Sequence, residues 1–214
     1  MLATLLASSG LAAWASSSPS APAAPGLFPV HPGPHGYFEY TLSPSAAVSG
    51  TVVVHDLTTA ASRYLVYVAG ATTSPTGGVA YGQPQANPHD TAAWVQLSAT
   101  SVQVPAKSAV AVHFKVAVPA GTLPGDYVAA LAAQTPTPVA SAPASSTKRG
   151  LRLLTTTRVV VAVVIHVPGP EAPGARFGAP NVTLQQHRLQ AINIPIDDTG
   201  NILVKPYLAG TLTS

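Results

Sequence analysis

The residue types best suited to ligand recognition gather in and just after one loop-forming stretch, Gly70–Ala92, which is rich in glycine and proline. Tyr81 lies within this stretch and Trp94 follows it. Rings of this kind present apolar faces on which sugars and peptides stack, and the polar side chains around them can hydrogen-bond hydroxyl and amide groups. The candidate glycan-binding residues are Tyr81, Gln83, Gln85, Asn87, His89, Asp90 and Trp94. In the alternative interpretation, Trp94 is a core tryptophan of the fold and Tyr81 only holds the loop in place.

Catalytic and metal-binding patterns are absent from the sequence. Of seven acidic residues only Asp197 and Asp198 are adjacent, and they begin an Asp-Asp-Thr-Gly sequence typical of a turn. The sequence contains neither a GxSxG nor an HExxH motif. His31 and His35 are four residues apart, but the Pro-Gly-Pro between them excludes the helix that would align them on a metal. The sequence therefore predicts a protein that is not an enzyme and has no metal site and no cofactor.

Charge is scarce throughout the chain. Its 214 residues include 10 Lys and Arg and 7 Asp and Glu, so that 8% are charged, against about 25% in ordinary soluble domains. The net charge of +3 and the lack of a basic cluster argue against a nucleic-acid partner. The 22 prolines and 17 glycines, the many valines and the absence of cysteine are typical of a secreted all-β protein without disulfides.

Short β-favouring runs separated by proline and glycine make up the middle of the chain. In Ala109–Val118, large apolar residues alternate with Ala111, His113, Lys115 and Ala117, which predicts a strand with one buried face. The nine apolar residues Val159–Val167 fall short of the roughly 20 that a membrane helix needs, and they indicate a strand buried on both faces. Tyr127 resembles a tyrosine whose hydroxyl caps a sandwich corner. The expected strands are residues 36–42, 48–57, 62–69, 93–97, 101–104, 109–118, 125–134 and 151–167, with at most a short hairpin around residues 79–81.

These features predict an all-β protein, an immunoglobulin-like antiparallel β-sandwich followed by a partial second β-sandwich domain. An apolar run that ends in Ala-Trp-Ala predicts a signal peptide, and a Ser/Pro/Ala-rich stem follows it. The tail contains three strand-like runs, residues 175–184, 188–196 and 201–212, and its 40 or so residues are too few for a core of their own. The predicted segments are signal peptide 1–15, stem 16–26, sandwich 27–167, linker 168–174 and partial second domain 175–214.

Several phrases in order along the chain resemble one family of bacterial surface proteins. They are Gly36–Phe38 with Leu42–Pro44, Ala71–Thr73, Gly77–Tyr81, Ala93–Val95, and Val118–Gly121 leading into Pro124–Tyr127. This set resembles the DUF916 family, the peptidoglycan-binding domain of WxL-interacting proteins, and Gly200–Leu203 resembles the turn that begins the second domain's partner strands. The resemblance implies an immunoglobulin-like domain that binds peptidoglycan and a second domain, truncated here, that contacts a protein.

Two functions therefore stand as hypotheses. The first is a non-enzymatic secreted or cell-surface protein whose immunoglobulin-like domain binds peptidoglycan or another cell-wall glycan, with a cell-surface protein as a further partner. The alternative is a chaperone- or adhesin-like assembly module that acts through β-strand pairing with a protein partner. A spacer without a ligand is a third interpretation. Each places the chain outside the cytoplasm, and the sequence predicts no membrane span within it.

Overall fold

The computed structural model describes residues 24–74, 78–85, 90–136, 139–140, 154–185 and 188–204. The predicted signal peptide and most of the predicted stem lie outside these ranges. Within them the chain forms β-strands and a short 3₁₀ helix, η1 (Asp90–Trp94), so the expected all-β sandwich is confirmed.

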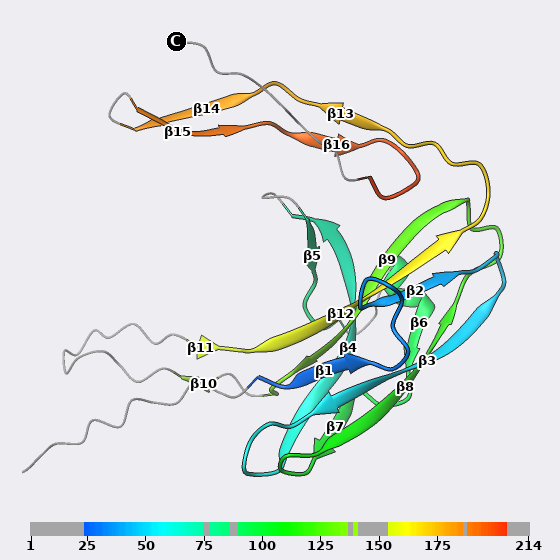
Figure 1. Ribbon diagram of the computed structural model, residues 1–214, viewed down its shortest axis with the longest axis vertical. Helices are drawn as coiled ribbons and strands as arrows, with labels where there is room; N and C mark the ends of the chain where they lie inside the picture. The colour runs from blue at the N-terminus through cyan, green and yellow to red at the C-terminus, as the bar shows by residue number, and fades with distance from the viewer. Residues whose placement is uncertain are drawn as a thin grey trace, which may run out of the picture.

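The first sheet has four strands and forms one layer of the sandwich (Figure 1). Their spatial order is β1-β3-β8-β6, and every neighbouring pair is antiparallel. The strands are β1 (Gly26–Pro29), β3 (Ala47–His55), β8 (Ala109–Ala117) and β6 (Val95–Leu97). Strand β1 was not predicted, and the run expected at residues 93–97 begins instead as the last turn of η1.

The second sheet has six strands in the order β2-β12-β9-β4-β5, with β7 also paired to β4. Its strands are β2 (Phe38–Thr41), β12 (Arg158–Val167), β9 (Gly125–Gln134), β4 (Ser62–Thr73), β5 (Val79–Tyr81) and β7 (Ser101–Val104). Strand β2 pairs parallel to β12, from Phe38 opposite Val163 to Thr41 opposite His166, in a sandwich expected to be antiparallel. A parallel pair is possible here because β2 and β12 are joined through most of the domain rather than by a tight turn.

The core lies between the two sheets. The alternation predicted for Ala109–Val118 is confirmed, because Val112, Phe114 and Val116 are buried while His113 and Lys115 are exposed. The ring of Phe114 meets that of Phe38 in the opposite sheet edge-on, with centroids 4.8 Å apart.

Gly50 on β3 lies opposite Phe114 on β8. A Cβ added to Gly50 would overlap the Phe114 ring and would lie 2.7 Å from the Tyr40 hydroxyl oxygen. The packing of the sandwich therefore requires a glycine at position 50, because the Phe114 ring lies directly against the glycine backbone.

A buried carboxylate stabilises the β3–β4 turn. The Asp56 side chain is fully buried, and its Oδ1 accepts a 2.8 Å hydrogen bond from the Thr58 amide. Burial alone would raise the pKa of the Asp56 carboxyl, but the Thr58 amide and the nearby hydroxyls of Thr58, Ser62 and Tyr64 outweigh it and hold that pKa below its ordinary value.

Strand β12 is buried less than the sequence predicts. Val161, Val163, Ile165 and Val167 are buried, whereas the alternate side chains are half-buried, so the expectation of two buried faces is wrong for this strand. Among the described residues, the second face of this sheet carries one small buried cluster beside β5. That cluster consists of Tyr67, Ala69, Ala130 and Ala132, with Tyr81 and Val160 packed against it.

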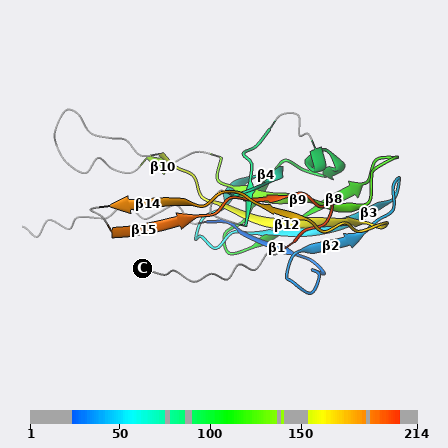
Figure 2. The ribbon, with the colours of Figure 1, turned by 90° about the horizontal axis from the view of Figure 1, so that it is seen from above.

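Beyond the sandwich, residues 175–198 form a two-stranded arm. It comprises the pair β13 (Ala175–Phe177) and β16 (Ile196–Asp198) and the pair β14 (Asn181–Gln185) and β15 (Arg188–Asn193). The amide of Gly178 donates to the Pro195 carbonyl at 2.8 Å and links the two pairs. Figure 1 shows the pairs end to end and apart from the layers of the sandwich, and in the view from above in Figure 2 the arm runs across the sandwich. The third predicted run, residues 201–212, is not a strand over its described residues 201–204, and its remainder lies outside the described ranges.

Two further residue pairs, β10 (Val139–Ala140) and β11 (Leu154–Thr155), form a short antiparallel ladder. It lies in the connection between β9 and β12, most of which falls outside the described residues.

Candidate functional site

The β4–β5 hairpin holds Tyr81 at the edge of the second sheet. Ala71–Thr73 at the end of β4 pair with Val79–Tyr81, and the Tyr81 ring packs against the small alanine-rich cluster. Arg158 on β12 donates from Nη2 to the Tyr81 carbonyl at 2.7 Å and from Nη1 to the Gly82 carbonyl at 2.6 Å. Because the Arg158 guanidinium hydrogen-bonds two consecutive carbonyls, it fixes the backbone at Tyr81 and Gly82.

A hollow of about 200 Å³ lies beside this hairpin. Tyr81, Gln85 and Asp90 line it together with backbone of β4, β5 and η1. Burial raises the pKa of the Tyr81 hydroxyl above its ordinary value of 10, so the hydroxyl stays protonated at neutral pH and can donate a hydrogen bond. The hollow therefore offers an aromatic ring, an amide and a carboxylate within one concavity.

The other predicted site residues are placed differently. Gln83 is exposed and does not line the hollow. Trp94 ends η1 and packs on the main core, with its ring centroid 4.7 Å from that of Tyr127. Asn87 and His89 lie outside the described residues. The structure thus brings three of the seven candidate residues together, while Trp94 is half-buried and packed against the main core.

Tyr127 has the corner role expected of it. Its hydroxyl donates to the Leu123 carbonyl at 2.9 Å, which ties the start of β9 to the preceding turn. The contact between the Trp94 and Tyr127 rings is therefore part of the packing of the sandwich.

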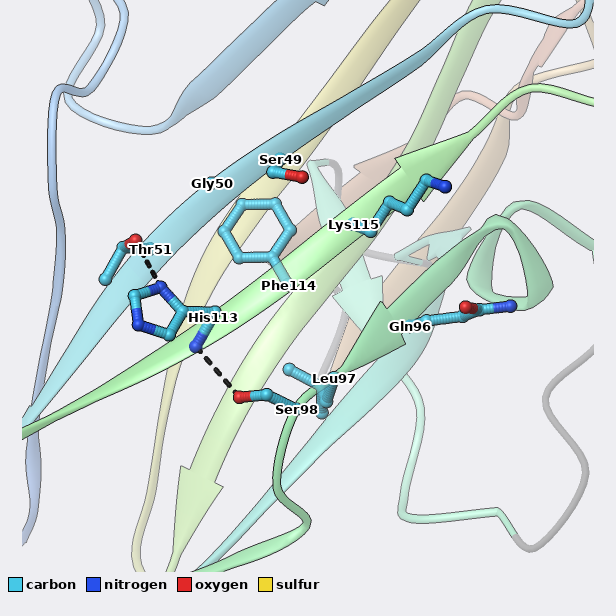
Figure 3. Close-up of a pocket in the computed structure, with 9 residues that line it drawn as sticks. All are labelled: Ser49, Gly50, Thr51, Gln96, Leu97, Ser98, His113, Phe114 and Lys115. Carbon is cyan, nitrogen blue, oxygen red and sulfur yellow. Dashed lines mark hydrogen bonds between the residues drawn. The ribbon is translucent and has the colours of Figure 1, made fainter.

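A larger groove of about 510 Å³ runs across the outer face of the first sheet (Figure 3). Its polar side chains come from three adjacent strands and from the residue after β6. They are Ser49 and Thr51 on β3, His113 and Lys115 on β8, Gln96 on β6, and Ser98. Sequence reasoning did not identify this groove as a site.

The polar residues of the groove form two rows across the strands. Lys115 is the register partner of both Ser49 and Gln96, which gives the first row. In the second row, His113 lies opposite Thr51, and its backbone exchanges two hydrogen bonds with Ser98: the Ser98 amide donates to the His113 carbonyl at 2.8 Å, and the His113 amide donates to the Ser98 hydroxyl oxygen at 3.1 Å. The nine lining residues, all of them described, include no carboxylate.

The His113 ring is held in place. Its Nδ1 lies 2.9 Å from the Thr51 hydroxyl oxygen, as the dashed line in Figure 3 marks, so Nε2 is left for other partners. The Lys115 ammonium has no salt bridge to any carboxylate in the described part of the chain. The groove therefore combines a cation with neutral hydrogen-bonding groups.

The base of the arm is bound to the sandwich through Asn201. Its Nδ2 donates to the Pro124 and Pro170 carbonyls at 3.0 and 2.9 Å, and its Oδ1 accepts from the Ala172 amide at 2.7 Å. A Cβ on Gly125, whose φ is +149°, would overlap the Asn201 carbonyl, so this close approach needs a glycine.

Asp126 adds a second set of bonds to the same joint. Its amide donates to the Asn201 carbonyl at 2.8 Å, and its Oδ2 accepts from the Leu203 amide at 2.8 Å. Its Oδ1 lies 2.8 Å from Nδ1 of His166 on β12. The sequence resemblance identified Gly200–Leu203 as a turn, and the structure shows that this turn fastens the arm.

Several of the described histidines make local side-chain contacts. His35, one of the pair spaced four residues apart, has its Nδ1 2.8 Å from Glu39 Oε1. No group of three or more metal-ligating side chains is found among the residues described. No helix in the described ranges has the length and apolar character needed to cross a membrane.

Comparison with known proteins gives one family. Residues 33–135 match the family described as WxL Interacting Protein, peptidoglycan binding domain, which confirms the resemblance found in the sequence. This segment contains Tyr81, Gln85 and Asp90 of the hollow and all six polar residues of the groove. No curated protein matches the chain.

Solved structures to which the chain is similar include fimbrial chaperones. The class 5 fimbrial chaperone CfaA is 12% identical, with a TM-score of 0.37 over 82% of this chain and 68% of that one. A chaperone–tip adhesin complex of CFA/I fimbriae is 11% identical, with a TM-score of 0.39 over 83% of this chain and 67% of that one. The CsuC–CsuE pre-assembly complex of *Acinetobacter baumannii* Csu pili gives 11% and 0.41 over 77% and 69%. At such values the likeness assigns no function to this chain.

Proposed function

Because residues 33–135 belong to the peptidoglycan-binding domain family of WxL-interacting proteins, we propose that this chain binds peptidoglycan or a related cell-wall glycan outside the cytoplasm, without catalysing a reaction. The family match is the observation that carries the proposal. The two concavities within the matched segment support it, since both offer neutral hydrogen-bonding groups suited to sugar hydroxyls.

The hollow beside β5 is the proposed contact for a sugar ring. Tyr81 supplies an aromatic face, and Gln85 and Asp90 supply polar groups at the rim. Arg158 positions this contact without touching the ligand, because its guanidinium is occupied by the Tyr81 and Gly82 carbonyls. Gln83, Asn87 and His89 are proposed to extend the same surface, and Trp94 to support it from the core.

Retention on purified peptidoglycan sacculi tests the proposal directly. The folded wild-type chain is expected to sediment with sacculi above an albumin control, and Tyr81→Ala is expected to lower retention several-fold. Phe177→Ala removes a half-exposed aromatic residue from the arm and is the matched control. A wild-type protein with a native circular dichroism spectrum that stays in the supernatant would refute the function.

The arm supports a second candidate function, strand pairing with a protein partner. Strands β14 and β15 pair with each other and with no other described strand, so each leaves one edge for another chain. Phe177, Val182, Ile192 and Ile196 are exposed along the arm. Light scattering across a range of concentrations tests self-pairing: growth of a dimer supports it, and a monomer at all concentrations counts against it.

The proposed export and segment boundaries have their own test. We propose that residues 1–15 are removed as a signal peptide and that residues 168–174 separate the sandwich, residues 27–167, from the partial second domain. Mass spectrometry of the protein recovered from the cell surface would show an N-terminus at Ser16. An intact Met1 on the exported protein would overturn the signal-peptide assignment.

A further inference from the structure

The groove on the outer face of β3, β8 and β6 has the chemistry of a site for an acidic sugar. Its two rows contain hydroxyl, amide and imidazole groups around a single ammonium, that of Lys115. Hydroxyls and amides hydrogen-bond neutral sugar hydroxyls, whereas an ammonium adds a charge-assisted bond to an anion. This combination distinguishes the groove from the hollow, where Asp90 carries the opposite charge.

The dimensions of the two rows suit one substituted sugar ring. Adjacent strands lie about 4.8 Å apart and alternate residues about 6.7 Å apart, so the two rows of polar residues cover about 10 by 7 Å. The groove of about 510 Å³ is shallow and open to solvent along the sheet. The two rows can therefore contact a sugar ring and its substituents at once, while the strands provide a rigid support.

The position of each polar group sets an orientation for the ligand. Lys115 lies between Ser49 and Gln96 in the first row, so an anion there would meet an ammonium flanked by a hydroxyl and an amide. In the second row, Thr51 contacts Nδ1 of the His113 ring and leaves Nε2 for another partner. The Ser98 hydroxyl accepts from the His113 amide and keeps its own proton to donate.

We propose that this groove binds a carboxylate-bearing sugar, with the carboxylate at Lys115 and the ring hydroxyls over His113 and Ser98. The inference rests on the proposed function for the kind of polymer that carries the sugar. Muramyl residues with a free lactyl group and hexuronate residues both supply such a carboxylate. The shared chemistry is a pyranose with one carboxylate and several hydroxyls.

Titration of the isotope-labelled full chain, followed through its amide signals, is the first test. N-acetylmuramate is expected to shift the amides of Ser49, Gln96 and Lys115, and N-acetylglucosamine, which lacks the lactyl carboxylate, to shift them much less. Glucuronate distinguishes a uronate source from a muramyl source. If free lactate moves these signals as strongly as N-acetylmuramate, the groove only attracts anions and the sugar assignment is overturned.

Lys115→Gln is the decisive variant, with Lys107→Gln as its matched control. Both lysines are exposed, but Lys107 lies in the β7–β8 turn outside the groove. Lys115→Gln is expected to weaken N-acetylmuramate binding about fivefold, the size of one exposed ion pair. Salt at about 1 M is expected to weaken wild-type binding to a similar degree. Equal binding by both variants and the wild type would overturn the inference.

Sacculus retention measured on the same proteins separates this inference from the proposed function. If wild-type protein and Lys115→Gln are retained equally while N-acetylmuramate shifts no groove signal, the groove assignment falls and wall binding stands. If N-acetylmuramate shifts the groove but sacculi retain no protein, the proposed function falls and the groove remains an acidic-sugar site.

Discussion

The sandwich and the arm are built from the same kinds of strand residue but bury them very differently. Phe114 in β8 is 3% exposed, whereas Phe177 in β13 is 48% exposed. In the sandwich each sheet covers the other, so alternate side chains leave water. In the arm two strands form a single layer, and the side chains described for β13 and β16 are exposed.

The difference shows that backbone pairing and burial are separate requirements. Both regions satisfy their backbone groups through antiparallel ladders. An isolated pair of strands is at best marginally stable in water, because hydrogen bonds alone add little over those made with solvent. The sandwich is stabilised by its core, whereas the arm is bound to the sandwich through the hydrogen bonds of Asn201.

Truncation of the two phenylalanines gives the largest expected contrast. Phe114→Ala removes a buried ring that packs on Phe38 and covers Gly50, and it is expected to lower the free energy of unfolding by about 3–5 kcal/mol. Phe177→Ala is expected to change it by less than about 0.5 kcal/mol. Urea unfolding followed by tryptophan fluorescence measures both. Equal losses would mean that the arm is packed as firmly as the sandwich.

Two strand glycines sharpen the contrast within the sandwich. Gly50→Ala is expected to cost about 1–3 kcal/mol, because the new Cβ would overlap the Phe114 ring. Gly70→Ala on β4 meets no atom within 4 Å and is expected to be neutral or stabilising by up to about 1 kcal/mol. Thermal unfolding of the two variants gives the comparison, and a neutral Gly50→Ala would show that the sheets can separate locally.

The sequence predicted the sandwich well where the signal is local. Alternation in Ala109–Val118 fixed which residues face the core, and β7 and β9 begin and end at the predicted residues. Strand β1 was missed because four residues ending in proline give too short a pattern. The parallel pairing of Phe38 with Val163 was not predicted, since no local pattern tells which distant strands become neighbours.

The same limit explains what the sequence showed of the sites. Alternation placed His113 and Lys115 on the outer face, but their neighbours Ser49 and Gln96 follow from cross-strand register. The loop composition drew attention to Tyr81, Gln85 and Asp90, which do line one hollow. Their role in glycan binding stays a prediction, as do the roles of Gln83, Asn87, His89 and Trp94.

The joint between the two regions can be loosened without touching either core. Asn201→Ala removes the side-chain bonds to Pro124, Pro170 and Ala172, at an expected cost of about 1–2 kcal/mol to docking of the arm. Hydrogen exchange at the Asp126 and Leu203 amides is expected to quicken about tenfold, while the amides of β8 and the other amides of β9 keep their protection.

Asn193→Ala is the control for this joint, because it changes an exposed asparagine within the arm. It is expected to leave exchange at Asp126 unchanged. A loss of protection throughout the sandwich in Asn201→Ala would contradict a joint that acts locally, and unchanged exchange at Asp126 and Leu203 would show that Asn201 does not hold the arm.

Acid is expected to destabilise the sandwich through Asp56. Of the four losses of stability predicted here, this one is the smallest. Its folded pKa lies below the unfolded value of about 3.9, so the ionised carboxylate adds stability above that value, and this stability is lost as pH falls through the folded pKa. Asp56→Asn is expected to be about 1 kcal/mol less stable at pH 7 and to approach the wild type as the pH falls through the folded pKa of Asp56. Urea unfolding between pH 7 and pH 2 measures the stability of both proteins as a function of pH.

Asp197→Asn in the arm is the control and should change stability at pH 7 by less than about 0.5 kcal/mol. Parallel curves for Asp56→Asn and the wild type would mean that the buried carboxylate contributes nothing through its charge.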